Sequence, residues 1–356
     1  MMNIAPELKF ILDAIQQTPS ADNSQPWRLI CKKNTLTVCY DQKRCAQKTF
    51  SVDNPATLLS FGALLENIYQ SAQALGLEFE LKIPEPFDLD NPVYFDVTFF
   101  IKENPIISDK KCIPLFNRHT NRHPYLDKVL PKAHVEILRK MTINEARIVI
   151  IEDRSEIKNI AELVHLASEI RFQTQEVHEW LGRSLRFGIK SEEHNDGLDV
   201  NTLDLPPGGK IFLRLINNWQ RMKLLNIVGA YKVLSAIDSK CIKQAPALVA
   251  IISPNGFKNI LSTGQLMNRV WIKLNDQGIA VQPYYVVSDQ LHRRESGLIP
   301  KGLEKQATFV FNKANSIFHF NQNESLQMLL RIGYPTKKPI LSKRLPIEAV
   351  FSELAE

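Results

Sequence analysis

Cysteine is scarce in this chain of 356 residues, and its spacing excludes a disulfide scaffold. The five cysteines are odd in number and include no Cys-x-x-Cys pair, so they cannot close into a complete set of disulfides. Such usage is typical of a reducing compartment. The eight histidines show neither His-Glu-x-x-His nor His-x-His spacing, so we expect no metal site.

Long apolar runs are missing as well. No stretch approaches the roughly eighteen consecutive apolar residues of a membrane span, so we expect no membrane partner. The first thirty residues contain Glu7, Asp13 and Asp22 and lack a long apolar core, which is not the pattern of a secretory signal. We therefore expect a cytoplasmic protein.

Glycine-rich motifs and a one-sided charge are also absent. The 14 glycines form no Gly-x-Gly-x-x-Gly, no Gly-x-x-x-x-Gly-Lys and no Gly-x-Ser-x-Gly, which disfavours Rossmann and P-loop nucleotide sites and a nucleophile elbow. The 44 basic and 38 acidic residues are mixed along the chain, which disfavours a nucleic-acid partner but suits an anionic small ligand. Side chains would have to hold the phosphate of such a ligand.

The chain does contain helical and strand patterns, and they are interspersed, which favours an α+β fold with helices packed on sheet. Apolar periodicity predicts helices over 5–17, 55–76, 131–141, 155–181, 210–238 and 262–277. Alternation predicts a hairpin over 28–41, and further strands are predicted over 92–101, 146–153, 247–254, 279–287 and 307–312. A polar run at 190–209 interrupts the regular pattern.

Two of the predicted helices resemble each other. SFGALLENIYQSAQALGL (60–77) aligns without a gap to STGQLMNRVWIKLNDQGI (262–279), with the serine, both glycines and one leucine in register. Two unrelated amphipathic helices with a shared stop glycine would give this match. An internal duplication, in which two copies of one unit pack as a fused dimer, would give it too. We favour the duplication.

The segment FNRHTNRHPY (116–125) concentrates basic side chains. Arg118, Thr120 and Arg122 alternate, so in extended backbone they point to one side, and guanidinium forks suit the oxygens of a phosphate. The alternative is a solvated basic loop that pairs with surface carboxylates. Lys343 and Arg344 near the carboxyl terminus are either further cations for the same ligand or part of a basic tail.

The stretch TPSADNSQPWRL (18–29) contains more amides than a connector between a helix and a hairpin needs. Part of this stretch, PSADNSQPW (19–27), resembles a signature segment of the FMN-dependent nitroreductases. Three other segments resemble further signatures of that family: RHTNR (118–122), NDQGIAVQP (275–283), and LLRIGYP (329–335) with KRLP (343–346). In that family the first segment is a turn that follows the first helix, and the second grips the flavin phosphate. The four segments extend over most of the chain.

Their order departs from the family, in which the phosphate segment precedes the turn. Here the first part of the chain has the turn but no phosphate segment. The second part has the phosphate segment but no such turn. The resemblance implies a nitroreductase-like α+β fold in two tandem copies, 1–105 and 106–356, that form a pseudo-dimer with one composite flavin site. This resembles the Acg-type branch, whose lid is similar to residues 177–207, so we expect a lid-like insertion at about 155–240.

The resemblance also assigns residues to the flavin. Pro19, Ser20, Asn23 and Gln25 would meet the polar edge of the ring, and Pro283 with Tyr284 would border the ring on its other side. The phosphate would be held by residues from two segments: Arg118, His119, Thr120, Arg122, Lys343 and Arg344.

Two functions follow from this resemblance. One is an FMN-dependent oxidoreductase that passes electrons from a reduced donor to an organic acceptor. The other is an FMN storage protein whose lid blocks NAD(P)H. The second stays open because Tyr284, Tyr285 and Val286 stand where working nitroreductases often carry a Glu-Gly pair along the nicotinamide approach. A fused pair could act as a monomer.

Overall fold

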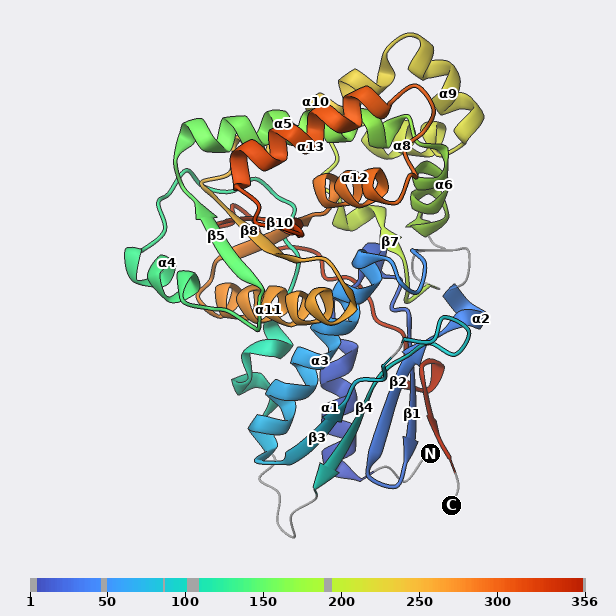
Figure 1. The fold of residues 1–356 in the computed structure, drawn as a ribbon, viewed down its shortest axis with the longest axis vertical. Coiled ribbons are helices and arrows are strands. Elements are labelled where there is room, and N and C mark those ends of the chain that lie inside the picture. Colours follow the sequence, from blue (N-terminus) through green and yellow to red (C-terminus); the bar gives the residue numbers. More distant parts are fainter. Residues whose placement is uncertain (1–4, 46–49, 86, 101–108, 189–193, 355–356) are drawn as a thin grey trace.

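The computed structural model describes residues 5–45, 50–85, 87–100, 109–188 and 194–354, and it arranges them as two β-sheets with helices between and above them (Figure 1). One sheet has five strands in the order β11-β1-β2-β4-β3, and the other has four in the order β5-β8-β10-β9. A short parallel pair, β6 with β7, lies apart from both. The mixed class of helices and strands expected from the sequence is therefore present.

The strands have the following bounds: β1 Trp27–Lys32, β2 Thr35–Tyr40, β3 Glu78–Lys82, β4 Val93–Phe100, β5 Arg147–Ile151, β6 Leu185–Arg186, β7 Leu198–Asp199, β8 Ala247–Pro254, β9 Ala280–Tyr284, β10 Glu324–Gly333 and β11 Phe351–Glu353. The α-helices have these bounds: α1 Pro6–Gln16, α2 Gln42–Cys45, α3 Pro55–Leu75, α4 Lys132–Arg139, α5 Arg154–Phe172, α6 Gln175–Ser184, α8 Gly209–Ile216, α9 Trp219–Ile227, α10 Ala230–Lys243, α11 Phe257–Asp276, α12 Val286–Glu295 and α13 Glu304–Phe318.

Four predicted elements are wrong in type or extent. The single helix predicted over 155–181 is two helices, α5 and α6, which are separated at Gln173–Thr174. The strand predicted over 307–312 lies inside α13, where Ala307, Val310 and Ala314 are buried at helical spacing. The strand predicted over 279–287 ends at Tyr284, because α12 begins two residues later. The single helix predicted over 210–238 is three helices, with breaks at Asn217–Asn218 and at Val228–Gly229, where the glycine has a left-handed φ of 86°.

The two sheets have the same arrangement of strands. In the first sheet, β1 and β2 come before α3 in the chain, and β3 and β4 come after it. The order across the sheet is β1-β2-β4-β3. In the second sheet, β5 and β8 come before α11 in the chain, and β9 and β10 come after it. The order across the sheet is β5-β8-β10-β9. Every neighbouring pair within these two sets is antiparallel. The carboxyl-terminal strand β11 then adds to the first sheet, parallel to β1.

Helices α3 and α11, which carry the two similar sequences, cross in close contact. A Cβ added at Gly62 would lie 2.0 Å from the carbonyl oxygen of Leu261, and one added at Gly264 would lie 2.3 Å from that of Leu59. These two contacts are reciprocal in the alignment of the two segments, which is the relation that a two-fold axis between two copies produces. Only glycine allows the backbones to come this close.

Polar pairs at the same crossing follow the same reciprocity. The guanidinium of Arg269 donates to both carboxylate oxygens of the buried Glu66, each at 2.8 Å. At the aligned positions of the opposite helix, Nδ2 of Asn268 donates to Oδ1 of Asn67 at 2.8 Å. The crossing therefore combines a close glycine contact with buried polar pairs, which fixes the register of the two helices.

The second sheet has helices on both faces. Successive residues of β8 alternate between two cores, with Val249 and Ile251 packed toward α11 and Leu248 and Ala250 packed toward α5 and α13. This explains why the whole strand reads as apolar instead of alternating. Figure 1 shows α5, α10 and α13 above this sheet and α11 below it.

Between β5 and β8 the chain makes an excursion through α5, α6, α8, α9 and α10. Helices α5 and α10 pack together and help to cover the sheet, whereas α6 to α9 extend beyond it (Figure 1). None of the helices among the described residues is long and apolar enough to cross a membrane.

Candidate functional site

The turn Pro19–Gln25 follows α1 and has an unusual backbone. Asp22, Asn23 and Gln25 all have left-handed φ values, of 49°, 56° and 49°. Such values cost about 1–2 kcal/mol each for residues other than glycine, so the surrounding structure must hold them. Ser20 contributes, because its Oγ accepts a hydrogen bond from the backbone N–H of Gln25 at 2.9 Å.

The segment 118–122 runs along α11 and β9. Nε1 of Trp271 donates to the carbonyl oxygen of His119 at 2.8 Å, and the backbone N–H of Asn121 donates to the carbonyl oxygen of Val281 at 3.0 Å. These hydrogen bonds hold the backbone of His119 and Asn121 against α11 and β9. The alternate residues Arg118, Thr120 and Arg122 line a cavity. The alternation in the sequence thus corresponds to an alternation of side-chain direction.

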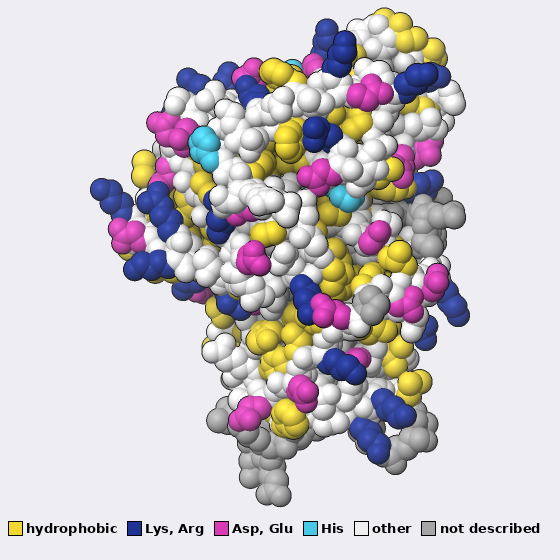
Figure 2. All heavy atoms as spheres, viewed as in Figure 1, with side chains coloured by type: hydrophobic (Ala, Val, Ile, Leu, Met, Phe, Trp, Pro, Cys, Tyr) yellow, Lys and Arg dark blue, Asp and Glu magenta, His cyan; other side chains and the backbone are white. Residues whose placement is uncertain are grey.

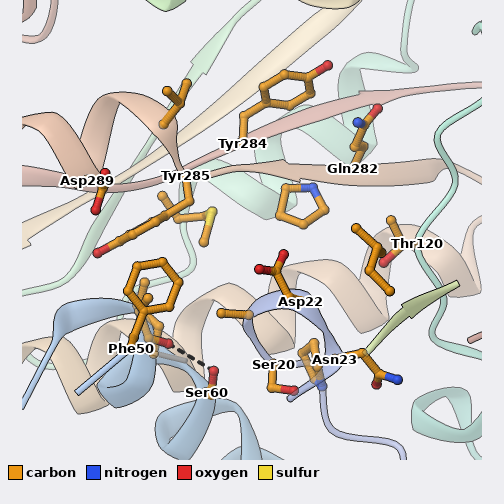
Figure 3. A pocket seen from close by; sticks show the side chains of 18 of the residues that line it. Ser20, Asp22, Asn23, Phe50, Ser60, Thr120, Gln282, Tyr284, Tyr285 and Asp289 are labelled. Atoms are coloured by element: carbon orange, nitrogen blue, oxygen red, sulfur yellow. Dashed lines mark hydrogen bonds between the residues drawn. The ribbon is translucent and has the colours of Figure 1, made fainter. Parts of the chain in front are cut away.

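This cavity has a volume of about 400 Å³, within the range of small-molecule and cofactor sites. Its walls come from the turn after α1, from α3 and α11, from the 118–122 segment, from β9 and the start of α12, from the carboxyl-terminal segment, and from the excursion between β5 and β8. Figure 3 shows Phe50, Tyr285 and Asp289 toward one end, with Thr120 and Gln282 toward the other.

Four guanidinium groups line the cavity, and three of them, those of Arg118, Arg122 and Arg344, form no ion pair with a described residue. Arg118 is 6% exposed, donates to the carbonyl oxygen of Gln17 at 2.7 Å, and lies over the ring of Trp271. Burial, and secondarily the charge of Arg344, hold its pKa well below the usual range. Burial likewise lowers the pKa of Arg344 to about 10. Two buried cations in one cavity favour an anionic ligand.

The third guanidinium faces a carboxylate. Burial lowers the pKa of Arg122, and the nearby charge of Asp22 opposes that shift. Burial raises the pKa of the Asp22 carboxyl, with Arg171 and Arg122 opposing the rise. The Asp22 side chain rises from the turn toward the middle of the cavity (Figure 3).

Several buried polar atoms of the cavity wall have no hydrogen-bond partner within the described part of the chain. They are Oε1 of Gln282, Oη of Tyr285, Oδ1 of Asp289 and Nε of Arg344. An unpaired buried polar group costs about 1–3 kcal/mol, so a cluster of them indicates a polar ligand. Burial raises the pKa of the Asp289 carboxyl, although Arg293 donates to its Oδ2 at 3.0 Å.

Aromatic side chains close one end of the cavity. The ring of Phe50 meets the ring of Trp180 edge-on at 5.3 Å and that of Tyr285 at 5.9 Å between centroids. Trp180 belongs to α6 of the excursion, and its ring also lies 5.7 Å from the guanidinium of Arg293. Arg293 in turn pairs with Glu176 of α6 at 3.1 Å. The excursion is thus bound over the cavity, as a lid would be.

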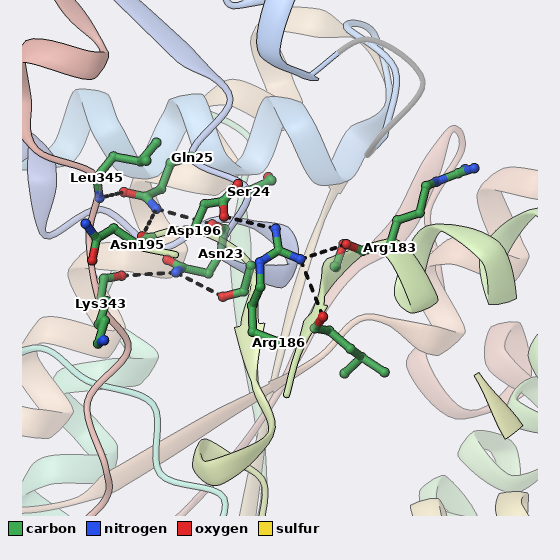
Figure 4. A network of polar contacts seen from close by, with 12 residues as sticks. Asn23, Ser24, Gln25, Arg183, Arg186, Asn195, Asp196, Lys343 and Leu345 are labelled. Atoms are coloured by element: carbon green, nitrogen blue, oxygen red, sulfur yellow. Dashed lines mark hydrogen bonds and ion pairs between the residues drawn. The ribbon is translucent and has the colours of Figure 1, made fainter. Parts of the chain in front are cut away.

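A polar network joins the turn to the excursion and the carboxyl-terminal segment (Figure 4). Nδ2 of Asn23 donates to the carbonyl oxygens of Gly197 at 3.1 Å and Lys343 at 3.0 Å, and its Oδ1 accepts from Arg344 at 2.8 Å. Nε2 of Gln25 donates to the carbonyl oxygen of Asn195 at 3.0 Å. The Asn23 amide is therefore fully used within the protein.

The structure brings most of the residues selected from the sequence to this one cavity. Nine line it: Pro19, Ser20, Asn23, Arg118, Thr120, Arg122, Pro283, Tyr284 and Arg344. Three do not. The backbone N–H of His119 donates to Oδ1 of Asn275 in α11, and its Nδ1 contacts the carbonyl oxygen of Asn117. Gln25 is a buried part of the network, and Lys343 contributes its carbonyl oxygen to Asn23.

Other lining residues were not selected from the sequence. Asp22 lies within the turn segment 19–27, between Ala21 and Asn23, and this local pattern does not indicate that its side chain points inward. Trp271, Trp180 and Asp289 lie on ordinary amphipathic helices, where an inward aromatic or acidic side chain looks like any core or surface residue. Only the packing of these helices distinguishes them.

Comparisons with known proteins give one related sequence and several solved structures. No family model matches the chain. An uncharacterized protein of Mycobacterium tuberculosis (strain CDC 1551 / Oshkosh) is 27% identical over 288 residues, which are 78% of this chain and 38% of the relative. The chain therefore spans well under half of the length of this curated relative.

The similar structures are nitroreductase-like. The FMN-dependent nitroreductase NfnB of Mycobacterium smegmatis, in complex with NADPH, is 11% identical, with a TM-score of 0.40 over 68% of this chain and 96% of that one. A nitroreductase of Bacteroides fragilis with bound FMN is 10% identical, with a TM-score of 0.38 over 67% and 95%. Because both TM-scores are below 0.5, the proposals below rest on the residues of this chain.

Proposed function

We propose that the protein binds FMN in this cavity and acts as a nitroreductase-type oxidoreductase. The observation that carries the proposal is the convergence of Arg118, Arg122 and Arg344 on one cavity, where Arg118 and Arg344 have no carboxylate partner among the described residues. A phosphate provides the charge that such a cluster lacks, and guanidinium forks match its oxygens. The unpaired polar atoms and the apolar wall suit a large planar ligand with a polar edge.

We further propose that the chain is an internally duplicated nitroreductase of the Acg type, with its halves at 1–105 and 106–356 and its lid within 155–240. The support is the common strand order of the two sheets and the reciprocal contacts between α3 and α11. The cavity takes the turn from one half and the arginine segment from the other, as two subunits of a dimer would share a site.

In this proposal the protein binds, orients and shields, and a bound flavin supplies the electron transfer. The arginines hold the anionic end, and Pro283 with Met267 and Trp271 form the apolar wall. Asp22 extends from the turn toward the middle of the cavity, and the charges of Arg171 and Arg122 oppose the rise of its pKa that burial causes. The ring contacts of Phe50 with Trp180 and Tyr285 exclude water from one end.

A second function, FMN storage, is favoured by the contacts that hold the excursion over the cavity. Hydrogen bonds from Asn23 and Gln25, together with the aromatic contact of Trp180, join it to the first half. Hydride transfer from NAD(P)H requires close and aligned approach, which a fastened lid prevents. An organic acceptor has to pass the same barrier.

The absorption spectrum of the protein as purified tests the cofactor first, and an anaerobic reduction then separates the two functions. We expect a yellow protein. Rapid bleaching by NADPH or NADH supports the oxidoreductase, whereas persistent colour that dithionite still bleaches supports storage. A protein that purifies colourless and takes up no added FMN contradicts both.

A further inference from the structure

The helices α8, α9 and α10 direct apolar side chains outward. Leu224 and Ile227 of α9 and Val228 at its carboxyl-terminal cap are spaced at i, i+3 and i+4, and the last two are 78% and 82% exposed. Helices α8 and α9 each bury one side chain, Ile216 and Met222. In most surface helices the apolar stripe faces the core, so a stripe that faces outward indicates a surface that binds something.

Neighbouring helices continue this apolar surface. Ile211 and Leu215 of α8 and Val233 and Ile237 of α10 are exposed at i, i+4 spacing. Hydrophobic and basic side chains lie together at the end of the molecule where Figure 1 places α8 and α9 (Figure 2). We call the exposed side chains of residues 209–243 the basic apolar surface.

The charge of this segment is one-sided. Residues 209–243 contain seven Lys and Arg and one acidic residue, so their net charge is +6, and the rest of the chain holds 37 basic and 37 acidic residues. All seven basic residues are exposed, and none forms an ion pair with a described residue. The single acid, Asp238, accepts from Ser168 at 2.6 Å. The whole excess charge of the protein therefore lies on one apolar surface.

We propose that this basic apolar surface binds the face of a membrane that contains anionic lipids. Amphipathic helices with Lys or Arg beside Leu, Ile and Phe lie in the interfacial region of a bilayer, where apolar burial and attraction to anionic headgroups add. Two copies of this chain would bring +6 against +6, which disfavours self-association. The inference is independent of the flavin, and it replaces the sequence expectation of no membrane partner, which considered only spanning segments.

Sedimentation of the full-length protein with lipid vesicles tests the proposal. We expect binding to vesicles of phosphatidylcholine mixed with phosphatidylglycerol, weak binding to phosphatidylcholine alone, and release at high salt because screening weakens the charge attraction. In Lys210→Gln and Lys223→Gln, each lost charge lowers the partition coefficient about fivefold. The double variant Ile227→Asp/Val228→Asp lowers it more than about tenfold, since it loses apolar burial.

Matched changes elsewhere serve as controls. Val129, which is 80% exposed, and Lys132 lie outside this segment, so Val129→Asp and Lys132→Gln should bind vesicles as the natural protein does. Because all altered side chains are exposed, thermal melts should stay unchanged. The proposal fails if anionic vesicles do not bind the protein, or if the variants of the basic apolar surface bind equally well. Dimers that Ile227→Asp dissociates, without vesicle binding, would instead identify a subunit interface.

Discussion

Arg118 is the residue for which function and structure are hardest to separate, because it contacts protein groups as well as the cavity. Its guanidinium donates to the carbonyl oxygen of Gln17 and lies over Trp271. Its pKa is lowered by burial and by Arg344, so its charge is held there at a cost to the fold. A residue kept in place against such a cost is more easily explained by a ligand than by stability.

We predict that Arg118→Ala weakens FMN binding about tenfold to a hundredfold, because a charge-assisted bidentate contact contributes about 1.5–3 kcal/mol. Titration of the flavin-free protein with FMN, followed by flavin fluorescence, measures the change. Arg118→Lys keeps the charge and loses the fork, so we expect an intermediate loss. Arg139→Ala, at an exposed site on α4, serves as the matched control. Full occupancy of Arg118→Ala at low protein concentration would show that the phosphate is held elsewhere.

Nine of the lining residues were accessible from the sequence, for a definable reason. The turn and the arginine segment are local patterns, in which spacing alone determines direction, as with Arg118, Thr120 and Arg122. Asn23 was selected as a ligand group, but its amide is used in contacts with residues far away in the chain. Local spacing carries no information about such partners, so the sequence could not show that its capacity is taken.

At the scale of elements, the crossing of α3 and α11 gives a prediction with an unexpected sign. Gly→Ala inside a helix is ordinarily stabilising by about 0.5–1 kcal/mol. At Gly62 the added Cβ would lie 2.0 Å from the carbonyl oxygen of Leu261, so the helices must separate. We therefore expect Gly62→Ala to lower the free energy of unfolding by about 3 kcal/mol or more.

Urea denaturation followed by circular dichroism measures this loss. Gly209→Ala is the matched control, because the Cβ added there meets only side-chain atoms of Leu205 and Pro206, at 3.0 Å or more. We expect that control to change stability little. If Gly62→Ala were as stable as the control, the close contact between the two helices would be absent in solution.

The second sheet contains a pair that makes stability depend on pH. The guanidinium of Arg147 on β5 donates to both oxygens of Glu324 on β10, at 2.9 and 2.7 Å. This lowers the pKa of Glu324 from 4.5 to about 2. A depressed carboxyl pKa contributes stability above the unfolded value, and that contribution is lost as the pH falls from 4.5 toward 2.

We expect Glu324→Gln to cost about 1–2 kcal/mol near neutral pH, with the value reduced because Arg147 is partly exposed. The difference between the natural protein and this variant should shrink as the pH falls through that window. Urea denaturation at neutral and acidic pH measures it, with the exposed Glu348→Gln as control. A difference independent of pH would mean that the pair does not stabilise the fold.

Elements were predictable where their ends carry a chemical signal. Helix α3 begins at Pro55, after Asn54 whose Oδ1 accepts from the N–H of Ala56, and ends at the left-handed Gly76. The β1-β2 hairpin also lies where alternation placed it. The strand prediction for 307–312 is wrong because the same residues also place Ala307 and Val310 on one helical face. Strand β10 was not predicted, because Gln327 and Arg331, which are buried in the structure, interrupt its apolar run.

At the scale of the whole molecule, the cavity exists only because distant segments meet. The turn after α1, the arginine segment and the carboxyl-terminal segment lie far apart in the sequence. Asn23 of the turn forms hydrogen bonds with both the carboxyl-terminal segment and the excursion. A cavity assembled in this way is opened by loosening one segment while the others stay in place. The excursion is the segment best suited to this, since α6 contacts the first half through the ring of Trp180 on Phe50 and contacts α12 through Glu176 on Arg293.

Trp180→Ala should therefore raise the rate at which bound FMN leaves, because the variant loses the edge-on contact with Phe50 and the cation contact with Arg293. An aromatic pair contributes about 0.5–1.5 kcal/mol, which corresponds to a release about three to ten times faster. The recovery of flavin fluorescence after dilution measures this rate. Phe309→Ala, at an exposed aromatic of α13 away from the cavity, is the control. If Trp180→Ala also bleaches faster with NADPH, the lid limits access to the flavin, as storage requires. If release is unchanged, the excursion does not close the cavity.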